Sequence, residues 1–331
     1  MPAPLLTPNR LQTKAVNSIE IRVKGKQVRV PALNVNGMTI VVAGRWIKVA
    51  AVHDEQWMET ELEDPQACVK ELKEQRSHRL RADIFTFTQQ LPATVPKYPF
   101  HLEWDSVAAI RVVSFSDWWN NRVSTDLRRD VRKAAKVGVV VRPVPFNDDF
   151  VRGIMEIYNE TPVRQGRPFW HYKKCFDAVK LETATYLERS DFLGAFLGEE
   201  LIGFLKIVYV DQIARLMQII AKDAHRDKRP MNALIAKAVE VCAAEGCSHL
   251  TYGNYRYSQG ADSVTAFKHR NGFEEILVPR YYVPLTTKGK LVLHLRLHRG
   301  AKELAPDPIL RSLRRLRAFI YRHSPLTRKA A

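Results

Sequence analysis

Apolar and polar side chains alternate over several short stretches near the start of the chain. The run at 19–23, Ile-Glu-Ile-Arg-Val, is the clearest, and a glycine turn separates it from a second stretch at 27–30. Similar stretches follow at 38–42 and 46–52, each entered through a glycine. Because this alternation places apolar side chains on one face of a strand, we predict a small antiparallel sheet over residues 18–52.

Farther along, the pattern changes to the period and composition of helices. Helices are predicted at 64–81, 125–138, 148–161 and 169–181. The second of them has Thr125 as its expected N-cap and Gly138 as its expected C′ residue. Residues 82–88 and 139–144 are predicted strands, and the proline-rich stretch 91–100 is a predicted loop.

From residue 191 onward, the pattern of apolar and polar residues is again typical of strands. Strands are predicted at 191–197, 201–210 and 214–221, the first two joined as a hairpin by a Gly-Glu-Glu turn. A helix at 231–244, a strand at 248–252, a helix at 263–271 and a strand at 276–284 complete the series. This order predicts an α+β fold, with a mixed sheet flanked by helices.

Length, charge and cysteine content narrow the class of protein. A chain of 331 residues favours two domains, and the absence of a signal-peptide pattern or a long apolar run favours a cytoplasmic location, with contact at the inner face of the membrane still open. The net charge of +17 attracts nucleic acid, anionic lipid or a phosphorylated ligand without choosing among them. The four cysteines have no CxxC spacing, so we expect no metal site.

Two motifs resemble those of the GNAT acyltransferase superfamily. Residues 192–204 (FLGAFLGEELIGF) resemble its central hairpin, and residues 266–273 (AFKHRNGF) resemble its closing motif, where a helix ends at Asn-Gly-Phe before the last strand. The glycine suits a C′ position, which needs a positive φ. The resemblance therefore implies a GNAT-like domain from about residue 144 to residue 284.

Residues 128–139 (RRDVRKAAKVGV) resemble the step that joins the two halves of FemAB-like, double-GNAT proteins. The similarity continues in this style at Tyr158, Arg164, Gly166, Pro168 and Phe169. It implies two GNAT-like halves, the first degenerate. The expected domains are 1–124 for the first half, 125–143 for the connection, 144–295 for the acyltransferase domain and 296–331 for a basic tail.

The resemblance also implies an acyl donor, either acetyl-CoA or another acyl-CoA, or the aminoacyl-tRNA of FemAB-like enzymes. CoA-using members have a glycine-containing phosphate-binding loop before a helix. The matching positions here are Arg226, Arg229 and Met231, and only Arg226 agrees with the residue pattern of that loop. Cations ahead of a helix N-terminus form an anion cradle; the alternative is a solvated charged loop. The donor-binding residues expected here are Ile219, Ile220, Ala221, Arg226, Lys228 and Arg229.

Acyl transfer to an amine needs a proton donor and stabilisation of the oxyanion. Asn254, Tyr255 and Tyr257 follow the strand at 248–252, where GNAT-like folds splay open, and are the catalytic candidates; ordinary aromatic packing is the alternative.

The segment between the helices at 148–161 and 169–181 combines cations with an aromatic residue, which suits a small-molecule or sugar-like amine acceptor. The acceptor-binding candidates are Arg164, Arg167, Trp170 and His171. A buried tryptophan with a structural histidine is the alternative.

Residues 308–323 have the pattern of a basic amphipathic helix that lies on anionic membrane, docks on the protein's own core or binds RNA. Two functions remain open: a metal-independent N-acyltransferase, and a catalytically silent GNAT-like module that binds RNA or an anionic membrane.

Overall fold

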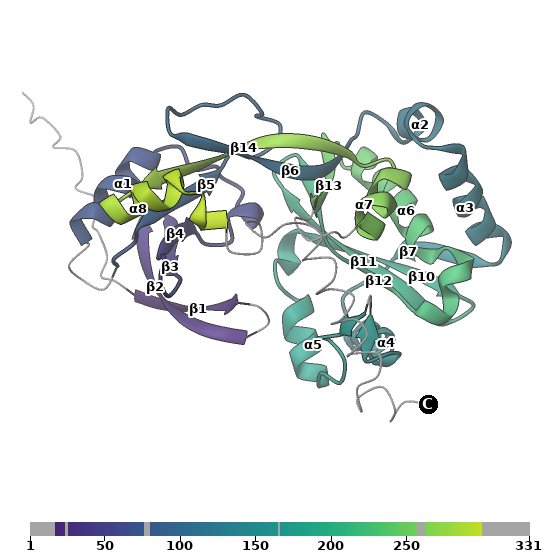
Figure 1. The fold of residues 1–331 in the computed structure, drawn as a ribbon. Coiled ribbons are helices and arrows are strands. Elements are labelled where there is room, and N and C mark those ends of the chain that lie inside the picture. Colours follow the sequence, from purple (N-terminus) through teal and green to yellow (C-terminus); the bar gives the residue numbers. More distant parts are fainter. Residues whose placement is uncertain (1–16, 24–25, 76–79, 165, 257–261, 300–331) are drawn as a thin grey trace, which may run out of the picture. The chain divides into compact units, whose positions relative to one another are not determined.

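The computed structural model describes residues 17–23, 26–75, 80–164, 166–256 and 262–299. They form two compact units (Figure 1). The N-terminal unit contains the described residues up to Trp104 together with 278–299, and the C-terminal unit contains those from Asp105 to Leu277. No helix in the described part of the chain combines the length and hydrophobicity needed to cross a membrane.

The N-terminal unit is built on the sheet predicted over residues 18–52. Strands β1 (Asn17–Val23), β2 (Lys26–Val35), β3 (Met38–Ala43) and β4 (Val49–Val52) pair in sequence order, each antiparallel to the next. β2 continues through Pro31, which was expected to end it. Pro31 pairs with Ser18 of β1, and the pairing with β3 begins only at Ala32. The missing N–H of the proline therefore breaks no ladder on the β3 side.

A helix and two more strands complete this unit. After the short helix η1 (Glu55–Trp57), α1 (Pro65–Glu74) buries Cys68 and Leu72 and leads to β5 (Ile84–Thr88). β5 lies parallel to β4 and antiparallel to β14 (Glu274–Pro284). The sequence did not predict α8 (Thr287–His294) and η6 (Leu297–Arg299), because a Lys-Gly-Lys start has weak helix propensity. The hydroxyl of Thr286 caps α8 by accepting from the Gly289 N–H at 2.8 Å.

From residue 125 onward, the longer helices and strands of the C-terminal unit follow the predicted order. Its sheet has the order β14-β6-β13-β12-β11-β10-β7. The strands of this sheet not yet introduced are β6 (His101–Arg111), β7 (Val139–Pro143), β10 (Ser190–Leu197), β11 (Glu200–Val210), β12 (Ile213–Ala221) and β13 (His249–Asn254). β12 pairs with β13 in parallel. The other pairs are antiparallel: β13 with β6, β12 with β11, β11 with β10, and β10 with β7.

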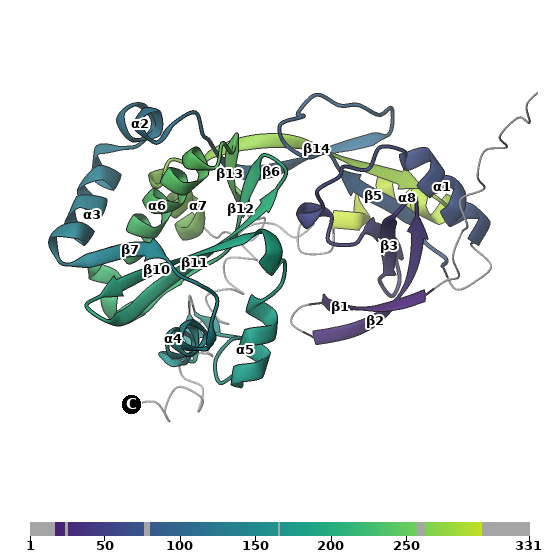
Figure 2. The same cartoon turned by 180° about the vertical axis from the view of Figure 1, so that it is seen from behind.

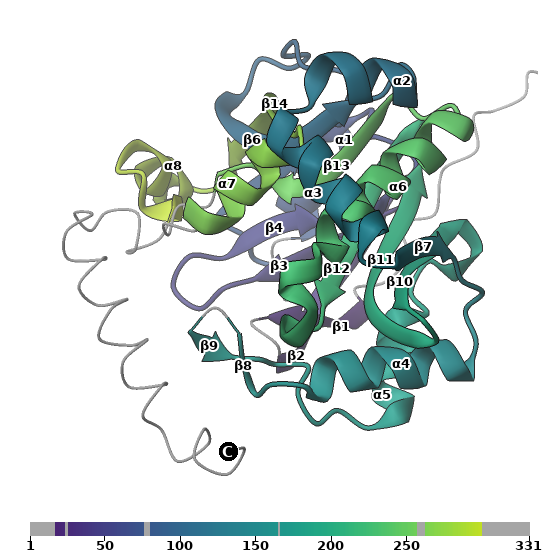
Figure 3. The ribbon, with the colours of Figure 1, turned by 90° about the vertical axis from the view of Figure 1, so that its right-hand side faces the viewer.

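Helices cover both faces of this sheet (Figures 1 and 2). On one face, α3 (Thr125–Lys136) and α6 (Pro230–Ala244) enclose a core of apolar side chains from β7, β10, β11 and β12. On the other, α4 (Asp148–Asn159) and α5 (Phe176–Thr183) pack over β10 and β11, as the side view in Figure 3 shows. The remaining short elements are α2 (Phe115–Asp117), η3 (Trp118–Arg122), β8 (Val163–Arg164), β9 (Arg167–Pro168), η4 (Leu187–Arg189), η5 (Asp223–Lys228) and α7 (Asp262–Arg270).

The predicted α+β class is confirmed, and several local predictions are corrected. Helix α3 is capped by Ser124 and not by Thr125, since the Ser124 hydroxyl accepts from the Leu127 N–H at 3.2 Å. Gly138 does have the positive φ of a C′ residue. Helix α5 begins at Phe176, not at residue 169, because residues 169–175 form a turn after the small hairpin β8–β9. Strand β6 was missed, because its polar half does not alternate with apolar residues.

The division into GNAT-like halves at residues 124 and 144 stays a prediction, and the compact units follow other boundaries. The expected tail helix at 308–323 lies outside the described residues.

Candidate active site

Strands β12 and β13 separate soon after they begin to pair. They are joined over three residue pairs only, from Ile213 with His249 to Arg215 with Thr251. On the other side of β12, the register with β11 shifts between Lys206 and Ile207, so that Met217 is an extra, bulged residue. A β-bulge bends its strand and increases the local twist, which accounts for the separation. In the described pairings, Leu216 and residues 218–221 of β12 are paired on the β11 side alone.

The loop after β12 leads directly into the N-terminus of α6. It contains the short helix η5 and ends at Arg229, whose φ of 61° is left-handed. No side chain caps α6, and Pro230 occupies its first turn. The N–H groups of this turn therefore keep their positive end exposed to a ligand or to water.

The three predicted donor-binding cations of this loop have different surroundings. Arg229 Nε lies 3.4 Å from Asp130 Oδ1 of α3, and Lys228 Nζ lies 3.6 Å from Asp227 Oδ1. Arg226 is exposed, and within the described residues its guanidinium has no ion pair. Arg226 is therefore the cation best placed to meet a phosphate from solution.

The start of the loop is held by Glu160, which the sequence reading did not single out. Its Oε2 accepts from the Asp223 N–H at 2.6 Å, and its Oε1 accepts from the Ala224 N–H at 2.8 Å. Arg164 joins the same network, donating to Glu160 Oε2 at 3.0 Å and to the Ala221 carbonyl at 2.8 Å. Arg164 is a predicted acceptor-binding residue, and these bonds hold its guanidinium at the start of the loop before α6.

The other donor-binding candidates are the last residues of β12. Ile219 packs into the core beneath α6, whereas Ile220 packs against the core beneath α4. Because their side chains point into the protein, the part of this segment that a donor could meet is the main chain.

The catalytic candidates lie where β13 ends. Asn254 is its exposed last residue, and its carbonyl accepts from Lys268 Nζ at 2.6 Å. The next residue, Tyr255, donates its N–H to the Ser106 carbonyl at 2.8 Å, and its own carbonyl accepts from the Thr265 hydroxyl at 3.2 Å. These bonds fix the backbone of Tyr255, and its ring is half-buried against the core. Tyr257 lies outside the described residues.

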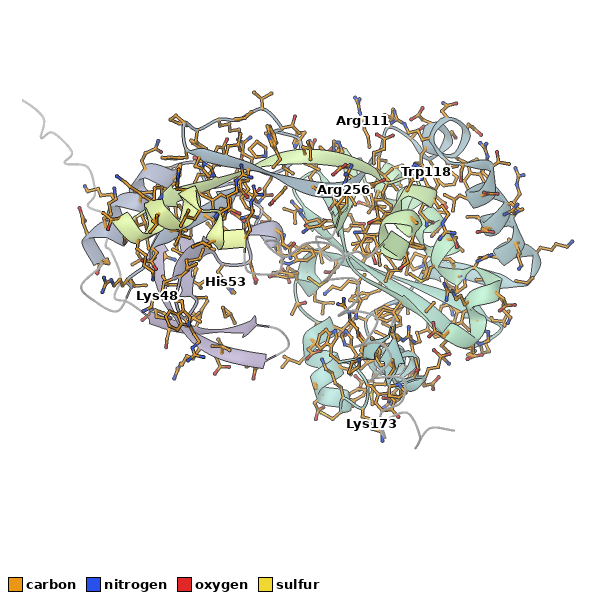
Figure 4. All side chains as sticks on the ribbon, in the orientation of Figure 1. Lys48, His53, Arg111, Trp118, Lys173 and Arg256 are labelled. Carbon is orange, nitrogen blue, oxygen red and sulfur yellow. The ribbon has the colours of Figure 1, made fainter. Side chains whose placement is uncertain are left out.

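Arg256, labelled in Figure 4, holds the end of this segment. Its Nε donates to Glu275 Oε2 at 3.0 Å, and the Ser106 hydroxyl donates to Glu275 Oε1 at 2.7 Å. The chain just beyond β13 is thus bonded both to β6 and to β14.

Lys268 of α7 is the principal residue that the sequence reading missed. It is fully buried, and its ammonium lies 4.5 Å from the centre of the Tyr252 ring. Burial lowers the pKa of Lys268 to about 8, so the group still carries its charge at neutral pH. Its burial is decided by tertiary packing, because the basic sequence Lys268-His269-Arg270 is that of an exposed helix end.

The acceptor candidates lie on the α4–α5 face. Trp170 is 54% exposed, with Lys174 Nζ 3.6 Å from its ring centre, and Arg167 is exposed on β9. His171 is buried, with the ring centres of Tyr158 and Trp170 at 4.2 and 3.7 Å. Such packing between two aromatic rings is more typical of a structural histidine than of a catalytic base.

Two further polar groups reach this face from the sheet. Gln218 of β12 donates to the Tyr158 hydroxyl, whose pKa is raised because the ring is buried. Lys206 of β11 is buried and donates to the Thr183 carbonyl at 2.7 Å and to the Thr185 carbonyl. Lys206 and Gln218 interrupt apolar strand patterns, a signal that the sequence reading passed over.

Comparisons with known proteins agree with this geometry. Residues 151–273 match the family model described as Acetyltransferase (GNAT) family. The structure is similar to that of FemX, at 9% identity over 84% of this chain and 90% of that chain, with a TM-score of 0.56. It is also similar to L-PGS from Bacillus licheniformis, at 14% identity over 79% and 85% of the two chains, with a TM-score of 0.52. No curated protein matches the sequence.

The protein is therefore an acyltransferase whose C-terminal unit carries a GNAT domain. The chain shares its fold with FemX along most of its length. The predicted family, fold class and enzyme class are confirmed. The individual site residues and the identities of donor and acceptor stay predictions.

Proposed function

We propose that the protein transfers an aminoacyl group from an aminoacyl-tRNA to the amine of a small acceptor. The observation that carries this proposal is the early separation of β12 and β13 beside the uncapped N-terminus of α6. The unpaired edge of β12 presents backbone N–H and C=O groups that can form hydrogen bonds with the donor, in the same way that a sheet edge pairs with an added strand. The nearby helix terminus favours the phosphates of the same donor.

The loop before α6 favours RNA over CoA as the source of those phosphates. Arg229, Pro230 and Met231 stand where a CoA-binding loop would have small residues, so the backbone approaches a pyrophosphate less closely. An exposed arginine can still contact a phosphate through its side chain, and Arg226 is placed to do so.

The reaction requires the acceptor amine to attack the ester carbonyl of the donor. A C–N bond forms, the bond to the ribose oxygen breaks, and the negative charge passes through the carbonyl oxygen. The buried ammonium of Lys268 supplies positive charge in a low-dielectric setting, where its effect on the oxyanion is strong. The Tyr255 hydroxyl donates a proton to the departing ribose oxygen, and the amine loses its proton to solvent or to a neighbouring base.

Trp170 and Arg167 are proposed to bind the acceptor. The exposed indole face suits stacking against a sugar ring, and the exposed guanidinium suits an anionic group on the same molecule.

A donor panel tests the proposal. Binding and single-turnover deacylation are measured with acetyl-CoA, a longer acyl-CoA and a mixture of aminoacyl-tRNAs, each with a set of amine acceptors. We expect deacylation of aminoacyl-tRNA that depends on an amine. Transfer from CoA esters alone would overturn the choice of donor, and tRNA binding without deacylation by any acceptor would favour the silent RNA-binding alternative.

A further inference from the structure

The N-terminal unit exposes an unusual group of large apolar side chains. Trp46, on the turn between β3 and β4, is 85% exposed. Leu291 of α8 and Leu295, the C-cap of this helix, are 57% and 49% exposed, and their spacing of four residues puts them on one side of the helix. Lys288, three residues before Leu291, donates to the Trp46 carbonyl, so the turn adjoins this face. We call Trp46, Leu291 and Leu295 the apolar patch.

The turn and helix that carry the patch are firmly anchored. Ile47, next to Trp46, packs against the buried cluster of Ile84, Val292 and Leu293. Gly44 has a φ of 114°, and a side chain there would collide with the Ile47 carbonyl. Ile47 is thus partly buried beside Trp46, and the tight turn leaves the indole itself exposed.

The two segments that carry the apolar patch contain basic residues and no acidic ones. Residues 44–48 and 287–299 contain no Asp or Glu. Their cations are Arg45, Lys48, Lys288, Lys290, Arg296 and Arg299, and Lys48 is labelled in Figure 4. Lys288 pairs with Asp83 at 3.1 Å, and Arg299 pairs with Glu103 at 2.9 Å. In the described part of the chain the other four have no ion pair.

We infer that the apolar patch docks on the surface of an anionic membrane. Indole rings favour the headgroup level of a bilayer, and leucines on a helix face enter the boundary of the acyl chains. Surrounding lysines and arginines are attracted to anionic headgroups. Nucleic acid is a poorer fit, because leucine side chains neither stack on bases nor form hydrogen bonds with them.

Sedimentation of the full-length protein with vesicles tests the inference. One set of vesicles contains phosphatidylcholine alone, and the other contains phosphatidylcholine with phosphatidylglycerol. We expect binding to the second set, reduced at least about tenfold by the double substitution Trp46→Ala with Leu291→Ser. Lys290→Glu should also weaken it, because it reverses a charge near the headgroups.

Leu181→Ser is the matched control, since Leu181 is 76% exposed on α5 and belongs to the other unit. It should leave vesicle binding unchanged. Melting curves should show that all three variants remain folded, because the altered side chains are exposed. Wild-type protein that ignores anionic vesicles, or a double variant that binds them as wild type does, would overturn the inference. Loss of tRNA binding in the double variant with vesicle binding retained would identify a nucleic-acid surface instead.

Discussion

Replacing Lys268 with methionine should make the protein more stable and less active. Methionine has a similar length and no charge, so it fits the buried position. Burial lowers the pKa of Lys268 from 10.5 to about 8. At about 1.4 kcal/mol for each pKa unit, the folded protein bears a cost of roughly 3 kcal/mol for keeping this charge at neutral pH. Because exposed Asn254 can replace the lost hydrogen bond with water, we expect a net gain of about 2 kcal/mol.

The pH dependence follows from the direction of the shift. Below pH 8 the lysine is protonated in both states, and the folded state carries the full cost. Between pH 8 and 10.5 the unfolded chain binds more protons, so the stability contributed by this group rises with pH. The advantage of Lys268→Met should therefore be complete at pH 7 and nearly absent at pH 10.5. Urea unfolding at the two pH values measures it.

Turnover should change in the opposite direction. Loss of one oxyanion-stabilising group typically lowers kcat by about 10²–10³-fold, and wild-type turnover should decline as pH rises through 8, where Lys268 loses its charge. Lys206→Met is the comparison, because that lysine is also buried with a pKa of about 8 but binds the carbonyls of Thr183 and Thr185. It should affect stability and leave turnover nearly intact. A Lys268→Met variant with normal turnover, or one destabilised equally at both pH values, would refute the reasoning.

Three further substitutions test the donor loop and the proton donor. Arg226→Ala should weaken aminoacyl-tRNA binding by about 1.5–3 kcal/mol at unchanged melting temperature, whereas Arg132→Ala, another exposed arginine, should not; equal effects would indicate nonspecific attraction. Glu160→Gln should raise the donor KM about tenfold with little change in kcat, since it loosens two N–H groups of the loop; a change confined to kcat would contradict this role. Tyr255→Phe should lower turnover about 10²-fold with binding retained, and full activity would assign the proton donor to another residue.

The sequence predicted the C-terminal fold because its elements follow local rules. The strands β10, β11 and β12 alternate or are continuously apolar, the hairpin has its glycine turn, and Gly138 and Gly272 both adopt the positive φ expected of residues after a helix. Strand β6 escaped prediction because its neighbours are strands distant in sequence, so nothing local marks its polar half. Helix α8 escaped for a similar reason: Gly289 lowers its helix propensity, yet the absence of a side chain lets α8 pack against the Asp83 carbonyl.

The candidate site was predicted less completely than the fold. Sequence order alone puts the loop with Arg226 and the strand end with Asn254 and Tyr255 next to the separating strands, and their roles stay predictions. The acceptor role of Arg164 stays a prediction, and its bonds to Ala221 and Glu160 could not be foreseen, because these residues become neighbours only when α4 packs on the sheet.

The sequence by itself thus determined most helices and strands of the C-terminal unit, the turns between them and the position of a basic loop before α6. These depend on periodicity and on backbone preferences that act within a few residues. Only the tertiary structure decided which charges are buried, which cations are already paired and where β12 parts from β13. Those properties depend on solvent exclusion and on contacts between residues far apart in the chain, as with Lys268, whose lowered pKa exists only because the fold removes it from water.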